Sequence, residues 1–138
     1  MERPEVVLDT NVFVAAGFRA GSASGRVLDL VRQGRLRHVW HEDTARETQR
    51  ILGMIPRLSW VAVEGLFAPG DRHVGDLDRA AFALVPDAAD RKFAALAAAA
   101  GAVLVSADED LLGVRDGLRH LGVTVVRPSQ VPGLVEQP

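Results

Sequence analysis

Three acidic residues stand where strands are predicted to end or a helix to begin. Asp9 directly follows the apolar residues 6–8, Asp108 follows the apolar run at 103–105, and Asp90 opens a long helical stretch. An open parallel α/β sheet builds its binding site at such positions, so we expect the three carboxylates to face one crevice. Carboxylates gathered in one crevice repel each other and persist as anions mainly when a cation joins them, and their hard oxygen atoms favour Mg²⁺ or Mn²⁺. The pattern predicts a carboxylate-bound divalent metal that faces a nucleic-acid phosphate.

Several of these acids also have a purely structural alternative. Asp9 could cap the helix expected after it, because Asp is a common cap at strand–helix junctions. Of Asp87 and Asp90, one could cap the next helix while the other projects from its first turn, or both could only complement the helix dipole. Glu47 lies within a predicted helix, where it could be a solvated residue paired with Arg50. Local features alone leave these alternatives open.

The segment SADED, residues 106–110, follows the predicted central strand. Ser106 and Glu109 fit a capping box, S-x-x-E, which makes both residues structural. Asp108 and Asp110 then remain free to face the crevice. An acid directly after a buried central strand is a better site candidate than an acid on an outer helix.

Motifs of other catalytic chemistries are absent from the sequence. There is no cysteine, which excludes a disulfide framework and thiolate chemistry and suits a reducing compartment. The four histidines show no zinc-binding spacing. Neither a glycine-rich phosphate loop nor a nucleophile elbow is present, so we expect no nucleophilic side chain.

Length and composition indicate one globular domain over residues 1–138. Hydrophobic residues make up 48% and charged residues 25%, which argues against disorder. A net charge of −2 excludes a generally basic nucleic-acid binder, although local arginines could still surround an acidic site, and Lys92 is the only lysine. No signal peptide is recognisable, and the longest apolar stretch, 93–105, is shorter than the roughly 20 residues that span a bilayer. We therefore expect a cytoplasmic protein without a membrane segment.

The elements that must position these acids follow from the hydrophobic periodicity and the turn residues. Strands are predicted at 5–8, 37–40, 102–106 and 122–126, with a further short strand at 73–74. Helices or helical turns are predicted at 10–17, 42–52, 59–66, 79–84, 87–100 and 108–112, with Gly53 as the cap of the helix at 42–52. A further helix is predicted through Val27 and Val31, with a stop at Gly34. Residues 19–25 are expected to form a loop, and Pro128 to start a terminal turn. The repeated βα order predicts a three-layer α/β/α sandwich with a short central parallel sheet.

Five segments together resemble the PIN-domain family. They are VVLDTNV at 6–12, ETQRIL at 47–52, DRKFAALA at 90–97, VLVSADEDLL at 103–112 and PSQ at 128–130. Each segment alone is weakly specific, but they occur in order and at family-like spacing over nearly the whole chain. The most similar members are stand-alone proteins described as toxin components of toxin–antitoxin pairs.

The resemblance implies an acidic quartet of Asp9, Glu47, Asp90 and Asp108, with Asp110 as an accessory acid. The expected activity is Mg²⁺- or Mn²⁺-dependent hydrolysis of RNA phosphodiester bonds. Asp9, Asp90 and Asp108 would hold one or two metals, which lower the pKa of a bound water and stabilise the charge on the phosphate. Glu47 would complete the metal's ligands or orient that water.

Further residues are expected to support this site. Thr10, Asn11 and Ser106 could aim the carboxylates through hydrogen bonds. Nearby arginines would contact the RNA backbone, with candidates at Arg19, Arg26, Arg46 and Arg91. Many relatives carry additional acids where this chain has Ala88 and Ala89, and a small polar residue where it has His41, which leaves substrate preference and metal affinity open.

Alternatives to this function remain at the level of sequence. One is a non-catalytic interaction module that keeps the fold, and another is a metal-dependent DNA nuclease or phosphatase that uses the same carboxylates. Expected partners are an RNA substrate, an antitoxin protein and a second copy of the chain. The homodimer would use an apolar patch from residues 27–31 and 60–67, although Trp60 and Phe67 could instead belong to the core.

Overall fold

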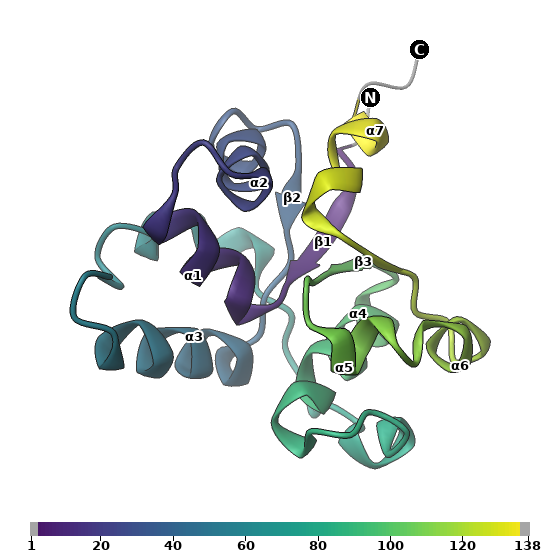
Figure 1. Cartoon of the computed structure of the whole chain (residues 1–138). Helices are drawn as coiled ribbons and strands as arrows, with labels where there is room; N and C mark the ends of the chain where they lie inside the picture. Colours follow the sequence, from purple (N-terminus) through teal and green to yellow (C-terminus); the bar gives the residue numbers. More distant parts are fainter. Residues whose placement is uncertain (1–2, 136–138) are drawn as a thin grey trace.

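The fold is built around a parallel sheet of four short strands, seen in a computed structural model that describes residues 3–135 (Figure 1). The strands are β1 (Glu5–Leu8), β2 (Arg37–His38), β3 (Val103–Val105) and β4 (Val125–Val126), in the order β2-β1-β3-β4. In the two central strands, Leu8 of β1 lies opposite Val105 of β3. Because the strands are parallel, the residues that follow Leu8 and Val105 emerge at the same edge of the sheet.

Helices cover both faces of this sheet (Figure 1). Val6 and Leu8 of β1 belong to the core cluster that includes α1 and α2, whereas Val7 belongs to the cluster that includes α4. This split follows from the alternation of side chains along a strand. The helices are α1 (Thr10–Phe18), α2 (Ala23–Arg32), α3 (Glu42–Met54), α4 (Arg91–Ala100), α5 (Glu109–Leu112), α6 (Arg115–His120) and α7 (Pro132–Val135). The predicted three-layer α/β/α architecture is confirmed.

Short 3₁₀ helices form part of the connections. In the described part of the chain they lie at Glu64–Leu66, Pro69–Asp71, Arg79–Phe82, Ala88–Asp90 and Pro128–Gln130. Two of them confirm the predicted helical turn after residue 79 and the predicted terminal turn at Pro128. Within residues 3–135, no helix has the length and apolar character needed to cross a membrane.

Several predicted boundaries are wrong. The expected loop at 19–25 ends early, because Ser22 Oγ accepts a hydrogen bond from Gly25 N and α2 begins at Ala23. Gly53 does not end α3, which continues to Met54, since a glycine stops a helix only when the chain turns there. The second strand is shorter than expected: it ends at His38, and Trp40 makes only an isolated bridge to Arg72.

Other differences involve segments with little periodic signal. The helix expected at 59–66 is only the 3₁₀ turn at its end, and the strand expected at 73–74 is absent from the structure described. Helix α6 was not expected, because Leu118 is its one buried residue and leaves no apolar stripe to recognise. Within the predicted dimer patch, Val27, Leu28 and Phe67 are buried in the core, whereas Val61 is 78% exposed. The surface proposed for the homodimer stays a prediction.

Candidate metal centre

Asp9 lies at the carboxyl end of β1 with its side chain turned to β3. Its backbone N–H donates to Val105 O at 3.0 Å, which extends the pairing of the two central strands. Its side chain makes no capping hydrogen bond to α1 in the described structure; instead, Oδ2 accepts a hydrogen bond of 2.7 Å from Ser106 Oγ. Asp9 is only 4% exposed. The capping alternative is therefore wrong for Asp9, and its carboxylate is available at the sheet edge.

Ser106 connects the acids of the two central strands. Its hydroxyl donates to Asp9 Oδ2 and accepts from Asp108 N at 2.9 Å. The predicted capping box with Glu109 is wrong, because α5 begins one residue after Asp108 and Asp108 Oδ1 accepts from Asp110 N. Glu109 instead contacts Arg127 at 3.3 Å. Ser106 matches the other role expected for it, orientation of a carboxylate.

Asp87 and Asp90 have different roles at the start of the long helical stretch. Asp87 Oδ1 accepts a hydrogen bond of 2.9 Å from Ala89 N and so caps the 3₁₀ turn that leads into α4. Asp90 makes no capping bond within the described residues and is 8% exposed. The left-handed Gly101 (φ 68°) closes α4 as expected. This division matches the alternative in which one acid caps the helix and the other projects from its first turn, with Asp87 as the cap.

The geometry around Asp90 fits a cation with oxygen ligands. One carboxylate oxygen each from Asp90, Asp108 and Asp110 lies within 4.8 Å of the others. Asp90 Oδ2 is buried and has no hydrogen-bond partner among the described residues. A buried oxygen without a partner is costly, and a divalent ion would satisfy it. Asp110, expected as accessory, stands in this group beside Asp90 and Asp108.

The electrostatics of the cluster point the same way. Burial raises the pKa of Asp9 to about 6, against the hydrogen bond from Ser106, and the Asp108 and Glu47 carboxylates add to the rise. Burial also raises the pKa of Asp90 to about 8, with further contributions from the charges of Asp9, Asp108 and Asp87. Both carboxyl groups therefore keep their protons at pH values above the ordinary range for an aspartate. A bound cation would replace those protons.

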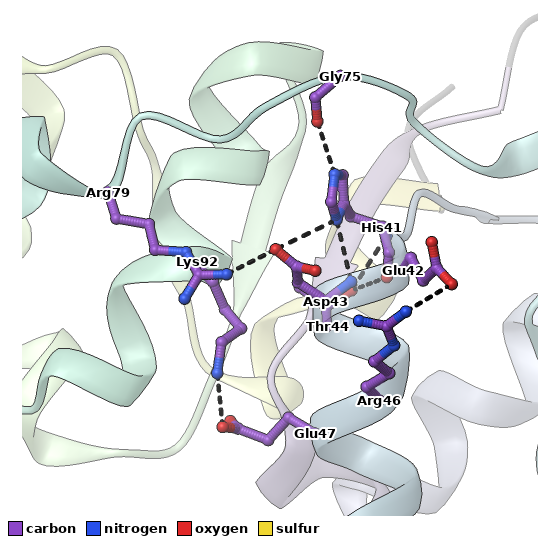
Figure 2. A network of polar contacts seen from close by, with 9 residues as sticks. All are labelled: His41, Glu42, Asp43, Thr44, Arg46, Glu47, Gly75, Arg79 and Lys92. Carbon is purple, nitrogen blue, oxygen red and sulfur yellow. Dashed lines mark hydrogen bonds and ion pairs between the residues drawn. The ribbon is translucent and has the colours of Figure 1, made fainter.

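Glu47 is held by a residue that sequence reasoning missed. Lys92 Nζ of α4 donates to Glu47 Oε1 of α3 at 2.6 Å, with the side chains 11% and 12% exposed (Figure 2). The alternative pairing of Glu47 with Arg50 is wrong, because Arg50 Nη1 is directed to Met54 Sδ at 3.7 Å. A lysine is rarely buried without a partner anion. The available signal was a single lysine placed two residues after Asp90.

A buried hydrogen bond next to the acids holds α3 against α1. Thr10 Oγ1 and Thr48 Oγ1 are 2.9 Å apart in a buried hydrogen bond, and these residues adjoin Asp9 and Glu47. The Thr10 hydroxyl is therefore engaged with Thr48, whereas a hydrogen bond from the Thr10 backbone lowers the pKa of Asp9. Asn11 Oδ1 is buried without a hydrogen-bond partner in the described part of the chain. The orienting role expected for Asn11 stays a prediction.

Two histidines, His38 and His41, and the candidate arginine Arg91 have structural partners. His41 caps α3, with Nδ1 accepting from Asp43 N and Nε2 hydrogen-bonded to Gly75 O (Figure 2). His38 is buried, and its burial lowers its pKa to about 4. Arg91 donates to the carbonyls of Val85 and Ala83, so the RNA contact expected of Arg91 conflicts with its structural role.

Comparison with known proteins adds two findings. The family model described as PIN domain matches residues 5–110. A chain from "Structure of FitAB bound to IR36 DNA fragment" is similar with a TM-score of 0.55 and 19% sequence identity, over 90% of this chain and 95% of that chain. This likeness shows a shared fold. No curated protein gives a significant match.

Proposed function

This chain belongs to the PIN-domain family, and on that premise we propose that it is a metal-dependent endoribonuclease. PIN domains are generally metal-dependent nucleases. The observation that carries the proposal is the meeting of Asp90, Asp108 and Asp110, with one Asp90 oxygen buried and unpartnered among the described residues. Asp9 joins them through Ser106, which contacts both Asp9 and Asp108. RNA as the substrate is part of the proposal.

The acidic residues would hold Mg²⁺ or Mn²⁺, with Asp9, Asp90 and Asp108 as ligands and Asp110 beside them. Such a cation supplies Lewis-acid charge that activates water and offsets the negative charge gathering on the phosphate. Ser106 keeps the Asp9 carboxylate in one orientation by its 2.7 Å hydrogen bond. Glu47, held by its hydrogen bond from Lys92, would accept a hydrogen bond from the attacking water and orient it.

The biological role proposed is the toxin of a toxin–antitoxin pair in the cytoplasm, acting as a single domain over residues 1–138. The five segments that resemble PIN toxins support this role. An antitoxin would inhibit by placing a basic side chain among the carboxylates, where its charge would stand in for the cation. A homodimer also remains a prediction, and light scattering at micromolar concentration would test it.

A cleavage assay tests the proposed activity. End-labelled single-stranded RNA and DNA of the same sequence are incubated with the wild-type chain, with Mg²⁺, with Mn²⁺ and with EDTA. We expect RNA cleavage only with metal, loss of at least about 100-fold in Asp9→Asn, and unchanged cleavage in Asp116→Asn, whose side chain is 88% exposed on α6.

Each other outcome selects an alternative. Cleavage of DNA alone would favour a DNA nuclease built on the same carboxylates. Absence of cleavage of either strand, with the protein folded and metal present, would favour the non-catalytic interaction module.

A further inference from the structure

A charged pocket adjoins the acidic cluster on the far side of Glu47. It has a volume of about 380 Å³ and is lined by charged side chains alone: Asp43, Arg46, Glu47, Arg50, Arg79 and Lys92. Four cationic groups face two carboxylates, which leaves an excess of positive charge in a chain whose net charge is −2. This local reversal of sign beside an acidic site calls for an explanation.

One face of α3 supplies most of the pocket. Asp43, Arg46, Glu47 and Arg50 are spaced i, i+3, i+4 and i+7, and therefore share a side of the helix. The opposite side of α3 is fixed to the core by Thr44, Thr48 and Leu52, which are buried. The charged face is thus held in place by the packing behind it, and its arginines Arg46 and Arg50 are not needed to anchor α3.

The three arginines of the pocket have only weak interactions with other protein groups. Arg46 contacts Glu42 at 3.0 Å, but the two side chains are 70% and 60% exposed. Arg79 contacts Asp43, with its side chain 46% exposed (Figure 2). Arg50 has the Met54 thioether as its partner and no carboxylate within the described residues. Exposed ion pairs contribute only about 0–1 kcal/mol, so a stronger anion can replace these contacts.

Glu47 and Lys92 form the border between the pocket and the acidic cluster. Their ion pair lines the pocket, while Lys92 lies two residues after Asp90. The Thr10–Thr48 hydrogen bond brings the residue after Glu47 against the residue after Asp9. An anion bound in the pocket would therefore lie directly beside the proposed cleavage site.

We propose that this pocket binds one backbone phosphate of the RNA strand, next to the phosphodiester that is cleaved. The inference rests on the proposed function and identifies how that site would grip its substrate. Guanidinium groups bind phosphate oxygens through paired hydrogen bonds, and Arg46 and Arg50, one turn apart, can approach one phosphate from the same side. Phosphate contacts position a strand without reading its sequence. They would also offset the repulsion between RNA and the acidic cluster.

The experiment measures RNA binding with hydrolysis switched off. All proteins carry Asp90→Asn, EDTA is present, and the anisotropy of a fluorescent single-stranded RNA is followed at several salt concentrations. The test variant is Arg46→Gln with Arg50→Gln. The matched control is Arg115→Gln with Arg119→Gln, an exposed arginine pair at the same spacing on α6.

We expect the test variant to raise Kd about 10-fold and to reduce the slope of log K against log salt by about 0.7 for each phosphate that the protein no longer neutralises. The control should change neither value appreciably. Equal effects in both pairs would overturn the proposal, because they would indicate only the general charge of the protein. Polyglutamate serves as a second probe. If the test variant lost binding to polyglutamate but kept its binding to RNA, the proposal would also be overturned, in favour of an acidic peptide as the ligand.

A second arm locates the phosphate. One linkage of the RNA at a time is made uncharged as a methylphosphonate. In the reference protein we expect one position to weaken binding, and in the test variant we expect that same position to have no further effect. Equal losses at every position in both proteins would contradict a defined subsite.

Failure of the subsite is distinguishable from failure of the proposed function. If the wild-type chain cleaves RNA while the methylphosphonate effects stay additive, the subsite alone is wrong. If the wild-type chain neither binds nor cleaves RNA, both proposals are wrong.

Discussion

Lys92 and Glu47, 45 positions apart in the sequence, form an ion pair with 2.6 Å between Nζ and Oε1 at the border of the acidic cluster. The pair joins α4 to α3, and both side chains are nearly buried. Lys92 therefore fixes the one acid of the quartet that lies on an outer helix. It also supplies a positive charge inside a site dominated by carboxylates.

Breaking this pair should destabilise the protein. Lys92→Met leaves the Glu47 carboxylate desolvated without a partner, and we expect a loss of about 3 kcal/mol in the free energy of unfolding, measured with urea. The double variant Lys92→Met with Glu47→Gln should recover most of that loss, because no uncompensated charge remains. Additive losses from the two single changes would show that the pair does not act as a unit.

Metal-free protein should lose stability as the pH rises from about 6 to 8. The folded-state pKa of Asp90 is raised from 3.8 to about 8, so the folded protein keeps a proton that the unfolded chain has released. In that interval linkage predicts a fall of roughly 2 kcal/mol. At lower pH the raised pKa of Asp9, about 6, and the lowered pKa of His38, about 4, act in opposite directions.

Urea denaturation in EDTA at a series of pH values measures this fall. Asp90→Asn should remove it, and saturating Mg²⁺ should reverse it by binding the ionised carboxylates. A wild-type stability that rises between pH 6 and 8 without metal would contradict the raised pKa of Asp90.

Ser106 should affect the metal through Asp9. Ser106→Ala removes the 2.7 Å hydrogen bond that favours the ionised form of Asp9, so the pKa of Asp9 should rise further. We expect Mn²⁺ affinity at pH 7 to fall about 10-fold or more. The pH at which binding is half-maximal should move upward, and Ser129→Ala, at an exposed serine, should leave it in place. An unchanged pH profile would rule out this orienting role.

Asp87 and Asp90 should respond oppositely to the same substitution. Asp87→Ala removes the cap bond to Ala89 N, and we expect a stability loss of about 1 kcal/mol with most activity retained. Asp90→Ala should abolish activity while the metal-free protein keeps or gains stability, because a buried repulsive acid is removed. Melting curves and cleavage rates of the two variants check this. Loss of activity in Asp87→Ala alone would mean that the acids were assigned in reverse.

The strands and the acids at their ends could be predicted from sequence because those signals are local. The apolar run before Asp9 and the spacing of Asp87 and Asp90 needed no knowledge of distant residues. The Lys92–Glu47 pair could not be found this way, since it depends on how α3 packs against α4. Ser106 was ambiguous for a related reason. Its capping-box pattern is local, whereas its bond to Asp9 spans 97 positions.

Glycine positions and hydrophobic periodicity did not predict helix boundaries correctly where tertiary packing determines them. Gly53 lies inside α3 because the buried Thr44, Thr48 and Leu52 hold that helix to the core beyond the point where glycine favours an end. The segment at 59–66 has buried apolar residues but only a 3₁₀ turn at Glu64–Leu66, because Val63 and Leu66 reach the core from a short connection. Composition alone does not separate such a connection from a short helix.

Calorimetric titration of Mn²⁺ at pH 7.5 tests the central claim most directly. The wild-type chain should bind the ion, Asp90→Asn and Asp108→Asn should each weaken binding at least about 10-fold, and Asp116→Asn on α6 should bind as the wild type does. Equal affinity in the wild type, Asp90→Asn and Asp108→Asn would contradict a metal centre built on these carboxylates.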